Sequence, residues 1–130
     1  MHNLVNQWAK QSYLNTLIEL LLNHGFRIYL TSDHGNIQAE GCGRPTEGSI
    51  ADMRGERARI YSDPVLRSKV KECFPDALEW GTVGLPENFF ALLAPYRKAF
   101  IQEGQSTVCH GSISVEELIV PFIQIDRKTE

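Results

Sequence analysis

The sequence predicts a domain of the α/β class, because helical and strand patterns alternate along a chain of single-domain length. Apolar residues recur at steps of three and four between residues 4 and 23, which is the spacing of one face of an amphipathic helix. Residues 26–32 then read as a strand, and a helix followed at once by a strand is half of an α/β crossover unit. At 130 residues the chain has the length of one domain, which we expect to span residues 1–130.

Turn residues and short apolar runs mark the next elements. Gly25 is expected to end the first helix in a left-handed conformation. Residues 36–55 are rich in glycine and predict a long loop, a kind of segment that is usually functional or mobile. Residues 56–62 alternate charged and apolar side chains and predict a strand, after which Asp63 caps a helix that begins with Pro64.

The last third of the chain contains shorter elements. Residues 78–83 and 118–125 predict strands, because both are apolar and bounded by polar or turn residues. Residues 88–94 fit either a strand or a helical turn, since a short apolar run does not distinguish the two. Ser114 and Glu117 have the spacing of a capping box, which predicts a short helix between them and the last strand.

The composition excludes several classes of protein. The net charge of −3 and the pI of about 5.8 disfavour direct nucleic-acid binding, which usually needs a basic excess. No apolar run reaches the ~18 residues of a membrane-spanning helix, and no basic segment leads into an apolar one, so we expect neither a membrane anchor nor a signal peptide. The three cysteines are scattered, which indicates free thiols and a cytoplasmic location.

Candidate chemistry begins where the strand over residues 26–32 ends. Asp33 and His34 stand at that point, and ligands of open α/β sheets gather at the carboxyl ends of strands. A carboxylate oxygen and an imidazole nitrogen suit a divalent ion such as zinc or manganese. A turn would let these neighbours converge, and Gly35 permits it. The alternative is that Asp33 caps a loop and His34 forms a local hydrogen bond.

A second histidine repeats this pattern. His110, followed by Gly111, also comes after a short apolar run and precedes a helix cap. Two histidine–glycine steps after strands favour a shared metal site of Asp33, His34 and His110, whereas the alternative is a histidine packed beneath the cap. Cys109, beside His110, is expected to be a small buried thiol and not a nucleophile, because no residue is positioned as its base.

Arginines provide the third candidate site. Arg57 and Arg59 lie on one face of the strand over residues 56–62, and guanidinium groups bind phosphates and carboxylates through two parallel hydrogen bonds. They are therefore candidate substrate-binding residues, with a solvated charged face paired with Glu56 and Asp63 as the alternative. A nucleic-acid-binding patch over Arg54–Arg59 is disfavoured by the acidic balance and by the absence of interleaved aromatic residues.

Two blocks of the sequence resemble a known family. They are "LTSDHGNIQAEGCGRPTEGSIADMRGERARIYSD" and "CHGSISVEELIVPF", and together they are similar to the PglZ domain of the alkaline phosphatase superfamily, over about Thr31 to Ile125. The resemblance implies a three-layer α/β/α fold with a central mixed sheet. It also implies a site with divalent metals, most often zinc, in which Asp33 and His34 bind one ion and His110 binds another.

The chain departs from the family pattern in its first part. The early strand with its Ser or Thr nucleophile is not found, and the Asp of an Asp-x-x-x-His segment would lie before Met1, with His2 standing where a further ligand histidine could be. We therefore expect a partial domain, the C-terminal portion of the fold, whose site is completed by an upstream or partner polypeptide. Apolar edges left by the missing strands also predict self-association.

Two functions follow from the resemblance. The first is the metal-binding half of a PglZ-type phosphoesterase, inactive alone and linked to bacterial anti-phage defence. The second is a non-catalytic interaction or scaffold module with a vestigial metal site. Three protein ligands suit one ion better than two, and phosphoryl transfer with two metals also needs an in-line nucleophile. The sequence does not identify the substrate.

Overall fold

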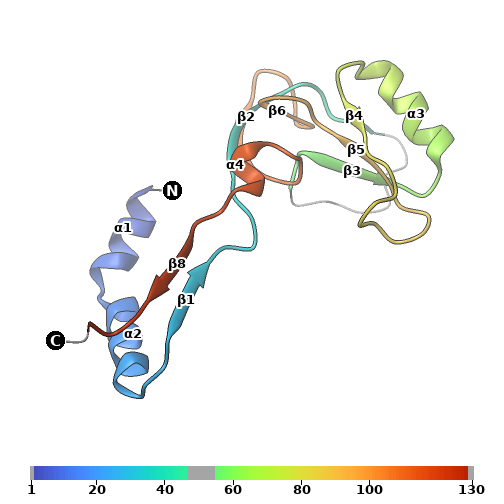
Figure 1. Ribbon diagram of the computed structural model, residues 1–130. Coiled ribbons are helices and arrows are strands. Elements are labelled where there is room, and N and C mark those ends of the chain that lie inside the picture. The colour runs from blue at the N-terminus through green and yellow to red at the C-terminus, as the bar shows by residue number, and fades with distance from the viewer. Residues whose placement is uncertain (1, 47–54, 129–130) are drawn as a thin grey trace. The chain divides into compact units, whose positions relative to one another are not determined.

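The computed structural model describes residues 2–46 and 55–128, which belong to two compact units (Figure 1). Unit 1 comprises Met1–Ser32 and Pro121–Glu130, and unit 2 comprises Asp33–Val120. The described residues form a mixed α/β structure of helices and small sheets, so the predicted α/β class is confirmed. One domain over residues 1–130 stays a prediction, as does the three-layer arrangement.

Unit 1 combines two helices with a two-stranded antiparallel ribbon. Its elements are α1 (His2–Lys10), α2 (Tyr13–Asn23), β1 (Ile28–Thr31) and β8 (Phe122–Ile125). In the ribbon Ile28 lies opposite Ile125 and Thr31 lies opposite Phe122. An ion pair between Arg27 and Asp126, 2.7 Å long, continues the pairing beyond the strands.

The helical segment of unit 1 is broken, so the prediction of one continuous helix over residues 4–23 is wrong. Ser12 adopts a left-handed conformation with φ of 56°, and the N–H of Gln11 donates to the carbonyl of Trp8, which closes α1. The break falls where Gln11 and Ser12 interrupt the apolar stripe. The predicted left-handed end of α2 at Gly25 is confirmed by its φ of 82°.

Unit 2 holds the larger share of the secondary structure. Its elements among the described residues are β2 (Ile37–Gly41), β3 (Ala58–Tyr61), α3 (Pro64–Cys73), β4 (Leu78–Glu79), β5 (Phe90–Leu93), β6 (Lys98–Ala99), β7 (Ser106–Cys109) and α4 (Val115–Leu118). The strands form one sheet in the order β6-β2-β7, which is mixed, and an antiparallel sheet in the order β3-β5-β4.

Several local predictions for unit 2 are confirmed. The helix α3 begins at Pro64, and the Asp63 carboxylate caps it by accepting the Val65 N–H at 2.8 Å. Residues 88–94 resolve as a strand, because Phe90–Leu93 pairs with β3 on one side and with β4 on the other.

Two strand predictions need shorter bounds. The strand expected at residues 78–83 is limited to Leu78–Glu79. The strand expected at residues 118–125 begins only at Phe122, because Leu118 still belongs to α4.

The strand β2 corrects the prediction that residues 36–55 form a loop. Ile37 and Ala39 are buried whereas Gln38 and Glu40 are exposed, which is the alternation of a half-buried strand. Gly41 belongs to the strand, where it pairs with Ala99 of β6. A glycine is required there because a Cβ atom would lie 2.0 Å from the carbonyl oxygen of Gln102. The glycine content therefore reflects close backbone packing in this part of the segment. Residues 47–54 lie outside the described part of the chain.

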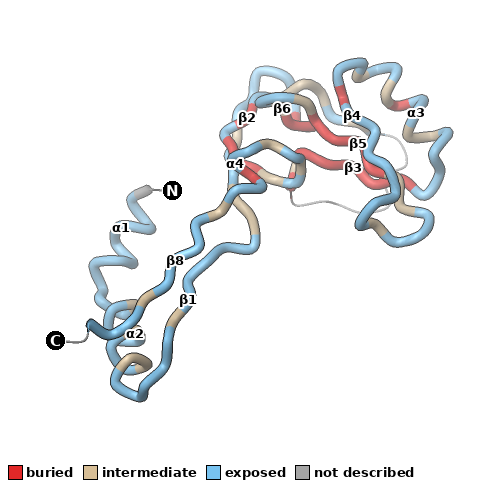
Figure 2. Tube along the Cα trace, in the orientation of Figure 1, coloured by how far each residue is buried: buried red, intermediate tan, exposed pale blue. Residues whose placement is uncertain are grey.

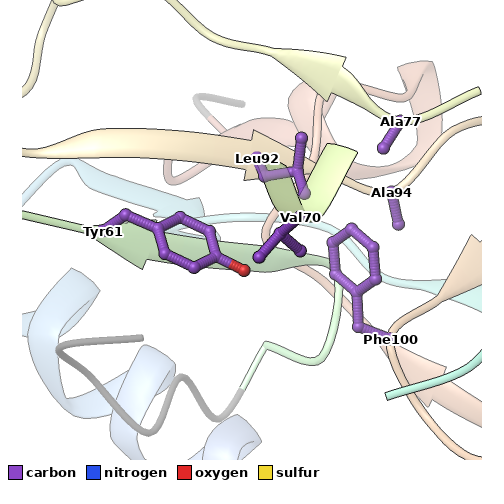
Figure 3. Close-up of a cluster of buried hydrophobic side chains, with 6 residues drawn as sticks. All are labelled: Tyr61, Val70, Ala77, Leu92, Ala94 and Phe100. Carbon is purple, nitrogen blue, oxygen red and sulfur yellow. The ribbon is translucent and has the colours of Figure 1, made fainter. Parts of the chain in front are cut away.

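Three apolar clusters form the core of unit 2. The largest joins Val70 of α3 with residues of β3 and β5. It consists of Tyr61, Val70, Ala77, Leu92, Ala94 and Phe100, which Figure 3 draws. A second cluster joins β2 with β7 and the segment around Ala99, and a third packs on β3 and β5.

Burial differs sharply between the units. The residues buried within the described ranges all belong to unit 2, and in Figure 2 the described part of unit 1 is pale blue and tan. Leu4 is 72% exposed and Trp8 is 50% exposed, although both belong to the apolar stripe of α1. Within residues 2–46 and 55–128, none of the helices has the length and apolar character needed to cross a bilayer.

Candidate functional site

Asp33 and His34 form a turn in which the two side chains approach each other. The His34 N–H donates to the Asp33 carboxylate at 3.0 Å, and the other Asp33 oxygen lies 3.6 Å from His34 Nε2. His34 Nδ1 lies 2.8 Å from the carbonyl oxygen of Gly35. If Nδ1–H donates to this carbonyl, the neutral ring carries its lone pair on Nε2, the nitrogen nearer to Asp33.

His110 is brought against His34 from a distant part of the sequence. It follows the last residue of β7, and its ring stacks on the His34 ring with centroids 3.9 Å apart and planes 22° apart. The N–H of His110 donates to the carbonyl of Gly55 at 3.1 Å, and Glu56 forms a parallel bridge with His110. The described backbone thus brings together the three residues that the sequence predicts as metal ligands.

Gly35 is needed at this turn for a reason other than the predicted one. Its backbone passes beside α4, where its N–H donates to the carbonyl of Glu117 at 2.8 Å. A Cβ atom on Gly35 would lie 1.9 Å from the carbonyl oxygen of Glu116. The residue therefore allows close contact between two segments, and a left-handed turn is not what requires it.

Glu117 is the residue of the site that sequence reasoning missed as a candidate. Its carboxylate accepts hydrogen bonds from the N–H groups of Ser112 at 2.9 Å and Ser114 at 3.2 Å, and from Arg57 Nε at 3.0 Å. Glu117 is only 3% exposed. Burial by itself raises the pKa of this carboxyl group, but the hydrogen bonds from Ser112, Ser114 and Arg57 outweigh it and hold the pKa below its ordinary value.

The capping-box spacing was the only sequence signal for Glu117, and it explains only part of its role. It predicts the hydrogen bond from the Ser114 N–H to the glutamate. Neither the contact with Arg57 nor the contact with Ser112 belongs to a capping box. A charged residue in the run "EELIVP" gives no indication that it is buried until its partner Arg57, just before β3, is known.

Arg57 and Arg59 are buried and hold internal partners. Arg57 is 1% exposed and donates to Glu117 and to the carbonyl of Lys98. Arg59 donates to Glu56 at 2.9 Å and to the carbonyl of Phe100 at 2.9 Å. The alternative of a solvated charged face is therefore wrong, although its pairing with Glu56 is confirmed.

A substrate-binding role for Arg57 and Arg59 stays a prediction. To reach a substrate, either guanidinium group would first have to give up its present hydrogen bonds. Arg54 lies outside the described residues, whereas Arg57 and Arg59, which belong to the same Arg54–Arg59 patch, are buried.

The thiol and hydroxyl groups near His110 are engaged in packing. Cys109 is 3% exposed, and burial raises the pKa of its thiol, which makes the reactive thiolate scarce. The prediction of a small buried thiol is confirmed. The Ser112 hydroxyl donates to the carbonyl of Ala94 at 3.0 Å.

The donor atoms at this site fit a divalent ion in part. Two ligands of one tetrahedral zinc ion lie about 3.4 Å apart, given bonds of about 2.1 Å, and the separation of Asp33 Oδ2 and His34 Nε2 is 3.6 Å. The stacked rings of His34 and His110 are nearly parallel, so their in-plane lone pairs do not converge at bonding distance. Binding of His110 to the same ion therefore requires one ring to rotate.

No group of three or more His, Cys, Asp or Glu side chains within the described ranges is already arranged to hold a metal ion. This agrees with the parallel stacking of His34 and His110. The side chain of His2, a further candidate ligand, lies outside the part of the chain that the structure describes.

Comparison with known proteins places the chain in a family. No curated protein and no solved structure matches the chain. The family described as "BREX system PglZ alkaline phosphatase-like domain" matches residues 1–125, a range that also includes the helices before Thr31. Alkaline phosphatase-like proteins typically use divalent metals, which agrees with the donor types at the site. The match covers nearly the whole chain, and the protein therefore belongs to the PglZ family of alkaline phosphatase-like domains.

Proposed function

We propose that this protein binds one divalent metal ion, zinc, through Asp33, His34 and His110. The observation that carries the proposal is the approach of these residues: Asp33 lies 3.6 Å from His34, which stacks on His110 at 3.9 Å. The side chain of Asp33 is 87% exposed and that of His34 is 39% exposed, so an ion and a ligand from outside can reach them. Rotation of one ring out of the stack completes the ligand set.

The proposed site is one half of a PglZ-type phosphoesterase-like centre. A bound divalent ion would supply Lewis-acid polarisation of a phosphoryl oxygen and a more acidic bound water. Three ligands suit one ion, and the second ion and the nucleophile must come from outside the described residues or from another polypeptide. We therefore expect little catalysis by this chain alone.

The same proposal includes the layer arrangement of the complete domain, its cellular location and its biological role. The completed domain is expected to form the three-layer α/β/α arrangement around a mixed sheet. Its location is the cytoplasm, and its role is in anti-phage defence, which is the setting implied by the BREX description of the family.

Metal binding tests this proposal directly. The chain, freed of metal with a chelator, should bind zinc in isothermal titration calorimetry with one ion per chain. Asp33→Ala and His110→Ala should each weaken zinc binding by at least about tenfold. His24→Ala is the control, because the His24 ring is exposed and contacts the Leu20 carbonyl in α2.

Two results would contradict the proposed metal site or its half-site character. Unchanged zinc affinity in both ligand variants would contradict the shared site. Robust hydrolysis of a generic phosphomonoester or phosphodiester by the chain alone would show that its site is complete and that the half-site proposal is wrong.

A second candidate function is a non-catalytic interaction module. Unit 1 favours it, because many apolar residues of its helices and ribbon are exposed: these are Leu4, Val5, Trp8, Tyr13, Leu17, Leu20, Tyr29, Leu30, Phe122 and Ile123. Apolar surface on this scale usually marks an interaction site. A two-stranded ribbon is also only marginally stable alone in water.

Light scattering tests the interaction module. The wild-type chain should form species larger than a monomer as its concentration rises, and a Leu4→Ser/Trp8→Ser variant should shift this association to higher concentration. A strict monomer at every concentration would rule out self-association and leave a different polypeptide as the partner.

A further inference from the structure

Glu117 is bonded to both histidine-bearing segments of the site. Its backbone carbonyl accepts the N–H of Gly35 at 2.8 Å, one residue after His34. Its carboxylate accepts the N–H of Ser112 at 2.9 Å, two residues after His110. One residue thus holds the turn that carries His34 and the loop that carries His110.

A buried counter-ion holds Glu117 itself in place. Arg57 Nε donates to the carboxylate at 3.0 Å, and the side chains of the two residues are 1% and 2% exposed. Arg57 also donates to the carbonyl of Lys98, and its own carbonyl accepts the N–H of Ala94 at 2.8 Å. The carboxylate is therefore tied to the sheet of β3, β4 and β5 through a hydrogen-bonded charge pair.

We propose that Glu117 is a positioning residue that keeps His34 and His110 in register for metal binding. The proposal rests on the proposed function, and it adds a residue that touches neither the ion nor a substrate. Groups that orient metal ligands commonly alter metal affinity by about 10- to 100-fold when they are changed. Loss of the carboxylate would release the loop after His110. The two segments would then lose the fixed spacing from which rotation of one ring completes the ligand set.

A neighbouring ion pair provides a matched comparison. Glu116 precedes Glu117 in α4 and pairs with Arg97, but the two side chains are 43% and 65% exposed. Exposed pairs of this kind contribute little to stability. Glu116→Gln therefore changes one glutamate of the same helix without affecting the hydrogen bonds that reach Ser112 and Ser114.

The test follows the histidine rings by NMR in the full chain without metal. Stacked rings shift each other's ring protons upfield, and His34→Ala and His110→Ala assign the two signals. In Glu117→Gln we expect both signals to move toward the positions seen in those single variants, while the His24 signal stays unchanged. Glu116→Gln should retain the wild-type signals. Zinc titration of Glu117→Gln should show affinity about 10- to 100-fold below wild type.

Three results separate this inference from the proposed function. Wild-type histidine signals and wild-type zinc affinity in Glu117→Gln would overturn the positioning role and leave the metal site intact. Loss of the stacked signals in Glu117→Gln, with no zinc binding by the wild-type chain, would support positioning and overturn the metal proposal. Loss of stability without any change in the ring signals would show that Glu117 acts only in folding.

A second variant is available if Glu117→Gln does not fold. Arg57→Met/Glu117→Met replaces the charge pair with apolar side chains of similar size, a change that buried ion pairs often tolerate. Loss of the stacked signals in this folded variant would support the inference, and their retention would overturn it. If the double variant also fails to fold, the pair is a folding determinant and the positioning role is rejected.

Discussion

The backbone of Gly35 lies so close to α4 that a Cβ atom at this position would be 1.9 Å from the carbonyl oxygen of Glu116. Neither backbone segment can move away without breaking the hydrogen bond from the Gly35 N–H to Glu117. Gly35→Ala should therefore lower the free energy of unfolding by roughly 1–3 kcal/mol or more. Chemical denaturation of both proteins measures the difference.

Gly81→Ala is the control for this substitution. A Cβ atom at Gly81 would meet no heavy atom within 4 Å, and its backbone is not left-handed. The unfolding free energy of the Gly81→Ala variant should stay within about 0.5 kcal/mol of the wild-type value. Equal effects at the two positions would mean that the close approach at Gly35 does not exist in solution.

The free energy of unfolding should depend on pH through the ionisation of Glu117. Its pKa in the folded protein is held below the ordinary value of 4.5, so the unfolded chain takes up the proton more readily. The stabilising contribution is complete above the ordinary pKa and is lost as the pH falls through the folded value. The gap in unfolding free energy between wild type and Glu117→Gln should therefore narrow as the pH falls below 4.5.

At neutral pH this gap should be large. Removing one partner of a buried ion pair costs about 3–5 kcal/mol, because Arg57 would be left buried without its counter-ion. Denaturant unfolding at several pH values measures both the size of this gap at neutral pH and its decrease at low pH. Glu116→Gln, which changes an exposed glutamate, is the comparison. A gap that stays constant with pH would show that the charge of Glu117 does not stabilise the folded protein.

The N-cap of α3 makes a local prediction. Asp63→Ala removes the carboxylate that accepts the Val65 N–H, and loss of such a cap costs about 1 kcal/mol. Thermal unfolding should show a lower midpoint than wild type. Glu72→Ala changes an exposed residue of the same helix and should leave the midpoint nearly unchanged. Equal midpoints for all three proteins would argue against the cap.

The cysteines should differ in reactivity. Cys73 is exposed, whereas Cys109 is buried and burial raises the pKa of its thiol. A thiol-alkylating reagent followed by mass spectrometry should label Cys73 in the native protein and Cys109 only after denaturation. Rapid labelling of Cys109 in the native state would mean that β7 opens readily at its end.

Much of the fold was predictable because its signals are local. The start of α3 follows from Asp63 and Pro64, which act within a few residues of each other. The prediction of a loop at β2 was wrong because it attributed the glycines of this segment to local turns. Gly41 is instead required by the close approach of its backbone to the carbonyl of Gln102, which is distant in the sequence. The break at Ser12 was visible as a gap in the stripe but was not interpreted as a helix end.

For the site, the sequence by itself determined which residues are candidate metal ligands, since the chemistry of Asp33, His34 and His110 depends only on residue type and on position after an apolar run. Only the tertiary structure decided that the two rings stack and that Glu117 joins their segments. The physical reason is that a charge can be buried only beside its counter-ion. Here that partner is Arg57, which directly precedes β3 and which folding alone brings to Glu117.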